Sequence, residues 1–117
     1  VDVVQYGWNM FDRRMQREIL PYCQEHGIGV LINRPFEEGA LFTRVRNRKL
    51  PGYAQEIGCT SWAQVFLKFI VSHPAVTCVI PATSRPEHMQ DNLQAGFGPM
   101  PDAAMRERMA KDFAASA

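Results

Sequence analysis

The sequence predicts an α/β fold built on parallel strands, because two short apolar runs alternate with segments of helical periodicity. The runs are Ile28–Ile32 and Val76–Ile80, and a proline follows each of them within three residues. Short apolar runs bounded in this way are typical of strands buried on both faces of a parallel sheet. Alternating strands and helices are joined by crossovers, so all carboxyl ends are expected at one edge.

The chain opens with a third candidate strand, Val1–Gln5, which carries one polar side chain in an apolar run. That residue, Gln5, needs a hydrogen-bond partner, and either neighbouring backbone or the amide group of a ligand would supply one. The next helix is expected to begin near Arg17, because Pro21 is tolerated in a first turn, and to stop before Gly27.

The middle of the chain predicts a loop, a short helix and a long amphipathic helix. Segment 42–52 is basic and contains Pro51-Gly52, so it is expected to be a loop whose cations are solvated or attract a phosphate group. Tyr53–Ile57 forms the short helix. Ser61 and Gln64 have capping-box spacing and open the long helix. Its apolar stripe is expected in the core and consists of Trp62, Val65, Phe66, Phe69 and Ile70.

Two further helices complete the order β-α-β-α-α-β-α-α. Ser84 and Glu87 again have capping-box spacing and open a helix that reaches Ala95, and Asp102 caps a last amphipathic helix. Three parallel strands alone would leave two open edges. Residues 1–117 are therefore expected to be one part of a larger structure, with no separate second domain.

Composition narrows the possible partners. The 117 residues contain 13 basic and 12 acidic side chains, a net charge of +1 that does not support a nucleic-acid or membrane-surface partner. Cys23, Cys59 and Cys78 are odd in number and lack metal-ligand spacing, so neither a metal site nor a disulfide framework is expected. Cys23 and Cys78 fall on predicted core faces as reduced thiols, which favours a reducing, cytoplasmic setting.

Polar residues follow the second strand at the position where parallel sheets bind ligands. Asn33 and Arg34 stand directly before Pro35, which is expected to hold Arg34 in extended geometry. The carboxyl ends of strands in α/β sheets and barrels are where ligands bind. These two side chains are therefore candidates for ligand contact.

Three motifs in register resemble the C-terminal portion of an aldo-keto reductase, a (β/α)8 TIM barrel that reduces carbonyls with a nicotinamide dinucleotide. They are VVQYGWN at residues 3–9, GIGVLINRPF at 27–36, and IPATS at 80–84 with Asp91-Asn92. The resemblance implies barrel strands six to eight plus the C-terminal extension. It also implies NADP or NAD as cofactor and an aldehyde or ketone as substrate of the intact protein.

The resemblance also implies a set of cofactor-binding positions. Gln5 corresponds to the amide that holds the nicotinamide carboxamide. The pyrophosphate is assigned to the loop residues Arg34, Pro35, Phe36, Gly39 and Leu41. Phosphate at a helix start is assigned to Thr83 and Ser84, and the adenine to Asp91 and Asn92.

The sequence departs from the family pattern at three places. Asn33 stands where the family often has an aromatic residue, and Glu37-Glu38 places two carboxylates beside the expected pyrophosphate. Ala82 and His88 replace the usual cations that clamp the 2′-phosphate, and His88 is either a cation near phosphate or a solvated side chain. The preference between NAD and NADP therefore stays open.

The family's catalytic Asp, Tyr, Lys and His belong to the first four strands, which the resemblance does not cover. Hydride transfer to a carbonyl needs a general acid, so this chain alone is predicted to be inactive without the N-terminal part of the barrel. Two alternatives are a dinucleotide-sensing module on the same barrel and an unrelated phosphate-binding barrel fragment. The substrate is left undetermined.

Overall fold

Three parallel strands form the sheet of this protein, whose computed structural model describes residues 2–10, 12–81 and 85–115. The strands are β1 (Val3–Gly7), β2 (Gly29–Asn33) and β3 (Cys78–Val79), in the order β1-β2-β3. The register pairs Gln5 with Leu31 and Leu31 with Cys78. The strands, order and helices match part of a TIM barrel, as predicted.

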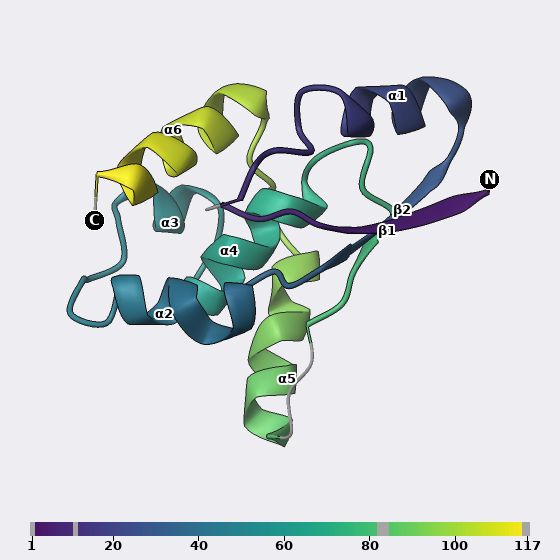
Figure 1. The fold of residues 1–117 in the computed structure, drawn as a ribbon. Coiled ribbons are helices and arrows are strands. Elements are labelled where there is room, and N and C mark those ends of the chain that lie inside the picture. The colour runs from purple at the N-terminus through teal and green to yellow at the C-terminus, as the bar shows by residue number, and fades with distance from the viewer. Residues whose placement is uncertain (1, 11, 82–84, 116–117) are drawn as a thin grey trace.

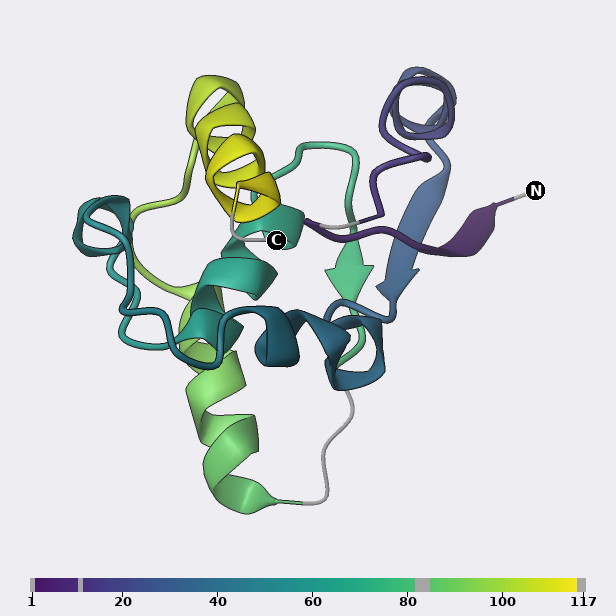
Figure 2. The same ribbon diagram turned by 60° about the vertical axis from the view of Figure 1, so that its left-hand side comes forward.

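Helices connect and follow the strands. Helix α1 (Ile19–His26) precedes β2, and α4 (Trp62–Val71) precedes β3. The remaining elements are the 3-10 helices η1 (Glu37–Gly39) and η2 (Gln94–Gly96) and the helices α2 (Ala40–Arg44), α3 (Tyr53–Glu56), α5 (Pro86–Leu93) and α6 (Ala103–Ala114). Figure 2 shows α2, α4 and α6 on one side of the strands, and in Figure 1 α5 projects away from the rest.

One face of the sheet, which we name the covered face, packs against the helices. Val30 and Ile32 are fully buried there, and the partly buried Val4 and Val79 pack against the same core cluster. The predicted stripe on α4 is confirmed, since Val65, Phe66, Phe69 and Ile70 are all buried, and Trp62 is half-buried. Burying each such side chain contributes about 1.5–3 kcal/mol, so this face holds the domain together.

The opposite face, which we name the open face, carries the alternate residues Val3, Gln5, Leu31 and Cys78. Val3 is 53% exposed, Gln5 and Cys78 are exposed, and Leu31 is half-buried. The prediction of strands buried on both faces was therefore wrong for this chain, as was the core position of Cys78. The apolar pattern was interpreted correctly as strand, but no described element covers this side.

The predicted helix caps were confirmed where residues close in sequence form the hydrogen bonds. Ser61 Oγ accepts the Gln64 N–H (3.2 Å) and Asp102 Oδ1 accepts the Met105 N–H (2.8 Å), which confirms both caps. The Gln64 side chain departs from a reciprocal capping box, because it accepts the N–H of Thr60 (2.9 Å). Ser84 lies outside the described residues, and α5 begins at Pro86 with Arg85 as its N-cap.

Two predictions about the segment after β2 need correction. Residues 40–44 form α2, so the predicted loop 42–52 begins later than expected. Arg34 has φ 50°, in the left-handed region, and is not extended as the following proline suggested. A tertiary hydrogen bond to the Arg34 carbonyl, described below, stabilises this geometry.

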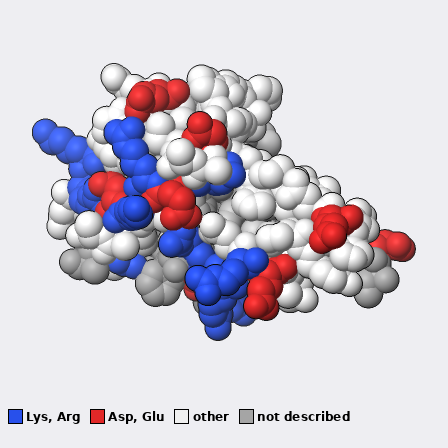
Figure 3. All heavy atoms as spheres, turned by 90° about the horizontal axis from the view of Figure 1, so that it is seen from above, with Lys and Arg blue, Asp and Glu red and all other residues white. Residues whose placement is uncertain are grey.

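Charged side chains pair across the surface. Arg13 contacts Glu107 (3.1 Å), and Arg48 contacts Asp112 (2.9 Å) with its guanidinium 5.4 Å from the Trp62 ring. On the face drawn in Figure 3, basic and acidic side chains lie beside each other in several places. Within the described ranges, no helix has the length and apolarity needed to cross a bilayer.

Candidate functional site

A buried asparagine ties the exit of β1 to the exit of β2. Asn9 is fully buried, and its Nδ2 donates to the Arg34 carbonyl (2.9 Å) and to Glu37 Oε1 (2.7 Å). Its Oδ1 accepts the Asp12 N–H (2.7 Å). Both Arg34 and Glu37 have left-handed backbone, with φ of 50° and 51°. Asn9 therefore fixes a turn that non-glycine residues adopt only at a cost of about 1–2 kcal/mol each.

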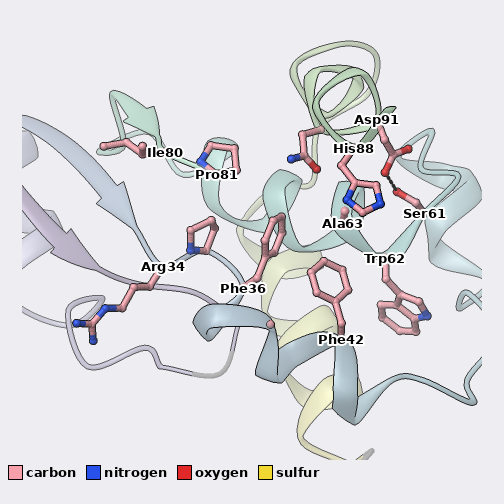
Figure 4. A pocket seen from close by; sticks show the side chains of 13 residues that line it. Arg34, Phe36, Phe42, Ser61, Trp62, Ala63, Ile80, Pro81, His88 and Asp91 are labelled. Carbon is pink, nitrogen blue, oxygen red and sulfur yellow. Dashed lines mark hydrogen bonds between the residues drawn. The ribbon is translucent and has the colours of Figure 1, made fainter. Parts of the chain in front are cut away.

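A cavity of about 690 Å³, which we name the aromatic cavity, opens beyond the carboxyl ends of β2 and β3 (Figure 4). Its walls come from the turn after β2, from α2, from the start of α4 and from α5. The lining residues are Arg34, Pro35, Phe36, Gly39, Phe42, Ser61, Trp62, Ala63, Ile80, Pro81, His88, Asp91 and Asn92. A volume of this size is typical of small-molecule and cofactor sites.

Interlocked rings form the apolar wall of the aromatic cavity. The Phe36 and Phe42 ring centroids are 4.8 Å apart, and Phe42 meets Phe66 edge-on at 5.5 Å. Trp62 stacks on Phe66 at 5.6 Å and donates its Nε1–H to the Arg48 carbonyl (3.2 Å). Tilted and edge-on ring pairs of this kind are favourable, so the wall has a defined shape before any ligand arrives.

The polar wall comes from α5. Asp91 accepts a hydrogen bond from Ser61 Oγ (2.6 Å) and another from Gln64 Nε2 (2.8 Å), so each carboxylate oxygen already has one partner on α4. Asn92 is 8% exposed, and His88 is exposed. The Arg34 guanidinium points away from the rings in Figure 4, although its residue lines the cavity.

A second cavity of about 540 Å³, which we name the strand-end cavity, lies at the ends of β1 and β2. It is lined by Gln5, Tyr6, Gly7, Asp12, Arg14, Met15, Asn33, Arg34 and Glu37. Arg14 forms a bidentate pair with Asp12 (2.8 and 2.7 Å), and this hydrogen bonding holds the pKa of the Asp12 carboxyl below its ordinary value. A methyl group at Gly7 would lie 3.4 Å from Asn33 Oδ1, so the two strand ends fit closely.

The structure divides the predicted site residues between the two cavities. Gln5 and Asn33 line the strand-end cavity, Arg34 lines both, and the aromatic cavity contains Pro35, Phe36, Gly39, His88, Asp91 and Asn92. Leu41 is 1% exposed inside the core and lines neither cavity, so the structure does not bring it together with the other predicted residues. Ala82, Thr83, Ser84 and the side chain of Glu38 lie outside what the structure describes.

Sequence reasoning missed several lining residues of the aromatic cavity. They are Phe42, Ser61, Trp62, Ala63, Ile80 and Pro81. Trp62 was assigned to the core from its helical spacing, and that spacing does not reveal that one side of the ring is left for a cavity. Ile80 and Pro81 carried a signal, because they stand at the end of a predicted strand, at the ligand-binding edge.

Together, the parallel strands and the cavities at their carboxyl ends define a barrel-type α/β protein with cavities at the edge where such folds bind ligands. The Aldo/keto reductase family profile matches residues 1–111, and the chain belongs to this family. It is therefore related to oxidoreductases. The predicted family resemblance is confirmed.

Known relatives agree with this assignment. An NADH-specific methylglyoxal reductase of Escherichia coli is 34% identical over 55 residues, which cover 47% of this chain and 17% of the relative. An uncharacterized oxidoreductase of Schizosaccharomyces pombe is 27% identical over 92 residues, covering 79% and 29% respectively. The chain thus spans less than a third of the length of these curated relatives.

Solved structures share the fold at low sequence identity. An aldo-keto reductase of Klebsiella pneumoniae in complex with NADP and acetate superposes with a TM-score of 0.72 at 21% identity, covering 95% of this chain and 39% of that one. The holo form of an aldo-keto reductase of Bacillus halodurans gives 0.69 at 21%, covering 100% and 44%. These likenesses establish the fold.

Proposed function

We propose that residues 1–117 form the cofactor-binding C-terminal part of an aldo-keto reductase barrel and that the two cavities together take one nicotinamide dinucleotide. The observation that carries this proposal is that Arg34 lines both cavities. A dinucleotide consists of two nucleotides joined by a pyrophosphate, so two adjoining pockets that share a basic residue suit its shape and charge. A guanidinium pairs with phosphate oxygens through charge-assisted hydrogen bonds.

The residues present fit such a group. In the strand-end cavity, the Gln5 carboxamide offers both a donor and an acceptor to the nicotinamide carboxamide. In the aromatic cavity, the rings of Phe42 and Trp62 supply apolar surface for adenosine, and Asn92 supplies hydrogen bonds to a base. When bound, the reduced dinucleotide supplies a hydride. The residues named here bind and orient it.

The relatives support a nicotinamide dinucleotide without selecting one form. The Klebsiella pneumoniae protein holds NADP, whereas the Escherichia coli relative is NADH-specific. Arg34 and His88 are the basic residues of the aromatic cavity within the described ranges, and neither gives the paired clamp that a 2′-phosphate prefers. We infer that both NADPH and NADH bind. Their relative affinities depend on how the site accommodates the phosphate or hydroxyl group at the 2′-position of the adenosine ribose.

Carbonyl reduction is assigned to the intact protein. Neither cavity has a lysine among its described lining residues, Arg14 hydrogen bonds hold the pKa of the Asp12 carboxyl below its ordinary value, and both Asp91 oxygens accept hydrogen bonds from Ser61 and Gln64. Protonation of the forming alkoxide requires a general acid from the rest of the barrel. The substrate is a small aldehyde or ketone, and turnover is expected only when the N-terminal part of the barrel is present.

The test is a titration of the purified chain with NADPH and with NADH, followed by the change in dinucleotide fluorescence. Saturable binding is expected, and Arg34→Gln should weaken it about tenfold, because charge-assisted hydrogen bonds are worth about 1.5–3 kcal/mol. Arg46→Gln, which alters an exposed residue outside both cavities, is the matched control and should leave affinity unchanged. No saturable binding, or equal effects of the two variants, would contradict the proposal. NADPH-dependent aldehyde reduction by this chain alone would refute the claim that the general acid comes from the rest of the barrel.

A further inference from the structure

A lysine lies fully buried in the middle of α4. Lys68 is 0% exposed, and its ammonium donates to the backbone carbonyls of Ile57, Phe97 (2.7 Å) and Pro99 (2.8 Å). An ammonium has three N–H donors, so all of them are satisfied. Among the described residues, no carboxylate lies within ion-pair distance of Lys68. The carbonyl oxygens alone therefore compensate the burial of this charge.

Two glycine turns build the cradle around the ammonium. Gly58 and Gly98 have φ of 66° and 78°, a conformation that favours glycine over residues with a side chain. A methyl group placed on them would lie 3.9 and 3.7 Å from Lys68 Nζ. Two turns that are 40 positions apart in the sequence thus point their carbonyls at one side chain. We name these three carbonyls and Lys68 the ammonium cradle.

The N-terminal end of α4 holds the same C-terminal segment at a second place. Gln64 Nε2 donates to the Asp91 carboxylate (2.8 Å) and to the Asp91 carbonyl (3.2 Å), and Ser61 Oγ donates to the other carboxylate oxygen (2.6 Å). Positions 61, 64 and 68 recur at helical spacing, so they share one side of α4. Segment 91–99 is therefore fastened to α4 at both of its ends.

Helix α5 buries few of its side chains. Residues 85–90 are all exposed, and Asn92 and Ala95 are the buried residues of the described segment 85–100. Figure 1 shows α5 extending away from the remaining helices. Its direction, and with it the place of Asn92 in the aromatic cavity, depends on the anchors at the α5–η2 end.

We propose that Lys68 is a positioning residue for the dinucleotide site, which acts through the carbonyls of Phe97 and Pro99 to set the α5 wall of the aromatic cavity. This inference rests on the proposed function above. Lys68 touches no ligand in this account. It holds the segment that carries Asp91 and Asn92 at the distance from Phe42 and Trp62 that an adenosine requires.

The test compares dinucleotide affinity in two destabilised variants, measured well below both melting temperatures. Lys68→Met keeps the length of the side chain but removes the ammonium, and the dissociation constant should rise about tenfold. Leu20→Ala is the matched control, because Leu20 is equally buried but lies in α1, and its constant should change less than about twofold. Unchanged affinity in Lys68→Met, or an equal loss in both variants, would refute the positioning role.

Chemical rescue separates positioning from general stability. In Lys68→Ala, propylammonium replaces the missing atoms and all three N–H donors, so it should restore dinucleotide affinity, whereas tetramethylammonium, which has no N–H group, should not. Equal rescue by both ions would overturn the inference. If the Lys68 variants do not fold, Gly98→Ala disturbs the ammonium cradle from the loop side and should weaken binding in the same direction.

A ligand-free measurement distinguishes this inference from the proposed function. Phe97 is 67% exposed, so chymotrypsin should cleave after it faster in Lys68→Met than in the wild type, with Leu20→Ala unchanged at this bond. An unaltered rate of cleavage after Phe97 would contradict the claim that Lys68 anchors this segment to α4. A wild-type chain that binds no dinucleotide would instead overturn the proposed function, and the positioning role with it.

Discussion

The covered face and the open face of the sheet are built from alternate residues of the same strands, yet their environments differ. Ile32 on the covered face is fully buried, whereas its neighbour Leu31 is half-buried on the open face. Both residues belong to one apolar run. The difference shows that an apolar run specifies a strand, while burial of each face depends on what packs against it.

The largest expected effect is a difference in stability between these two neighbours. Ile32→Ala should lower the free energy of unfolding by about 2–5 kcal/mol, because it leaves a cavity among helices that cannot fully collapse. Leu31→Ala should cost about 1 kcal/mol, since water already reaches part of that side chain. Urea unfolding of both variants measures the gap, and equal costs would mean that the open face is covered in solution.

The next effect concerns self-association through the open face. Val3 is an exposed apolar residue on an edge strand, so Val3→Lys should raise the concentration at which the chain associates by roughly tenfold. Sedimentation velocity over a concentration series measures this. Phe97→Lys is the control, because Phe97 is even more exposed but lies beyond η2. An equal response in both variants would count against association through the sheet.

A smaller effect is a pH dependence of stability through His73, which follows α4 and packs against the Trp8 ring. Burial, followed by the nearby charge of Arg106, lowers the pKa of His73, whose Nδ1 accepts the Ala75 N–H (3.1 Å). The unfolded chain therefore binds this proton first, and stability should fall as pH drops below about 6.5, levelling off below the folded pKa. Unfolding curves between pH 8 and about 5 test this. The dependence of the unfolding free energy on pH that is attributed to His73 should vanish in His73→Gln and persist in His88→Gln.

The smallest effect is expected at an exposed ion pair. Arg13 and Glu107 have side chains that are 36% and 50% exposed, and such pairs contribute about 0–1 kcal/mol. Arg13→Ala should therefore shift the denaturation midpoint barely beyond error, and less still at high salt. A loss as large as that of Ile32→Ala would mean that this pair fixes α6 to the first connection.

The sequence was most informative where neighbouring residues decide the structure. The caps at Ser61 and Asp102, the stripe on α4 and the three strands all follow from spacing over a few residues. The left-handed Arg34 did not follow, because its carbonyl is held by Asn9, 25 positions earlier.

Part of the candidate site could not be predicted from sequence patterns either. The division of Gln5 and Asn92 between two cavities depends on how α5 is placed, and the carbonyls around Lys68 come from segments far apart in the chain. A lysine inside an apolar helical stripe was the available signal, since a fully buried ammonium must find acceptors.

The hydrogen bonds of Asn9, which join the segments that follow β1 and β2, have a further consequence. Since Asn9 already holds the Arg34–Glu37 turn, a ligand that docks on this turn meets a surface whose conformational entropy was lost during folding. Association then requires little additional ordering of the backbone there, which is the thermodynamic advantage of a preorganised site. Asn9→Ala would transfer that ordering cost from folding to binding, even though its side chain need never touch the ligand.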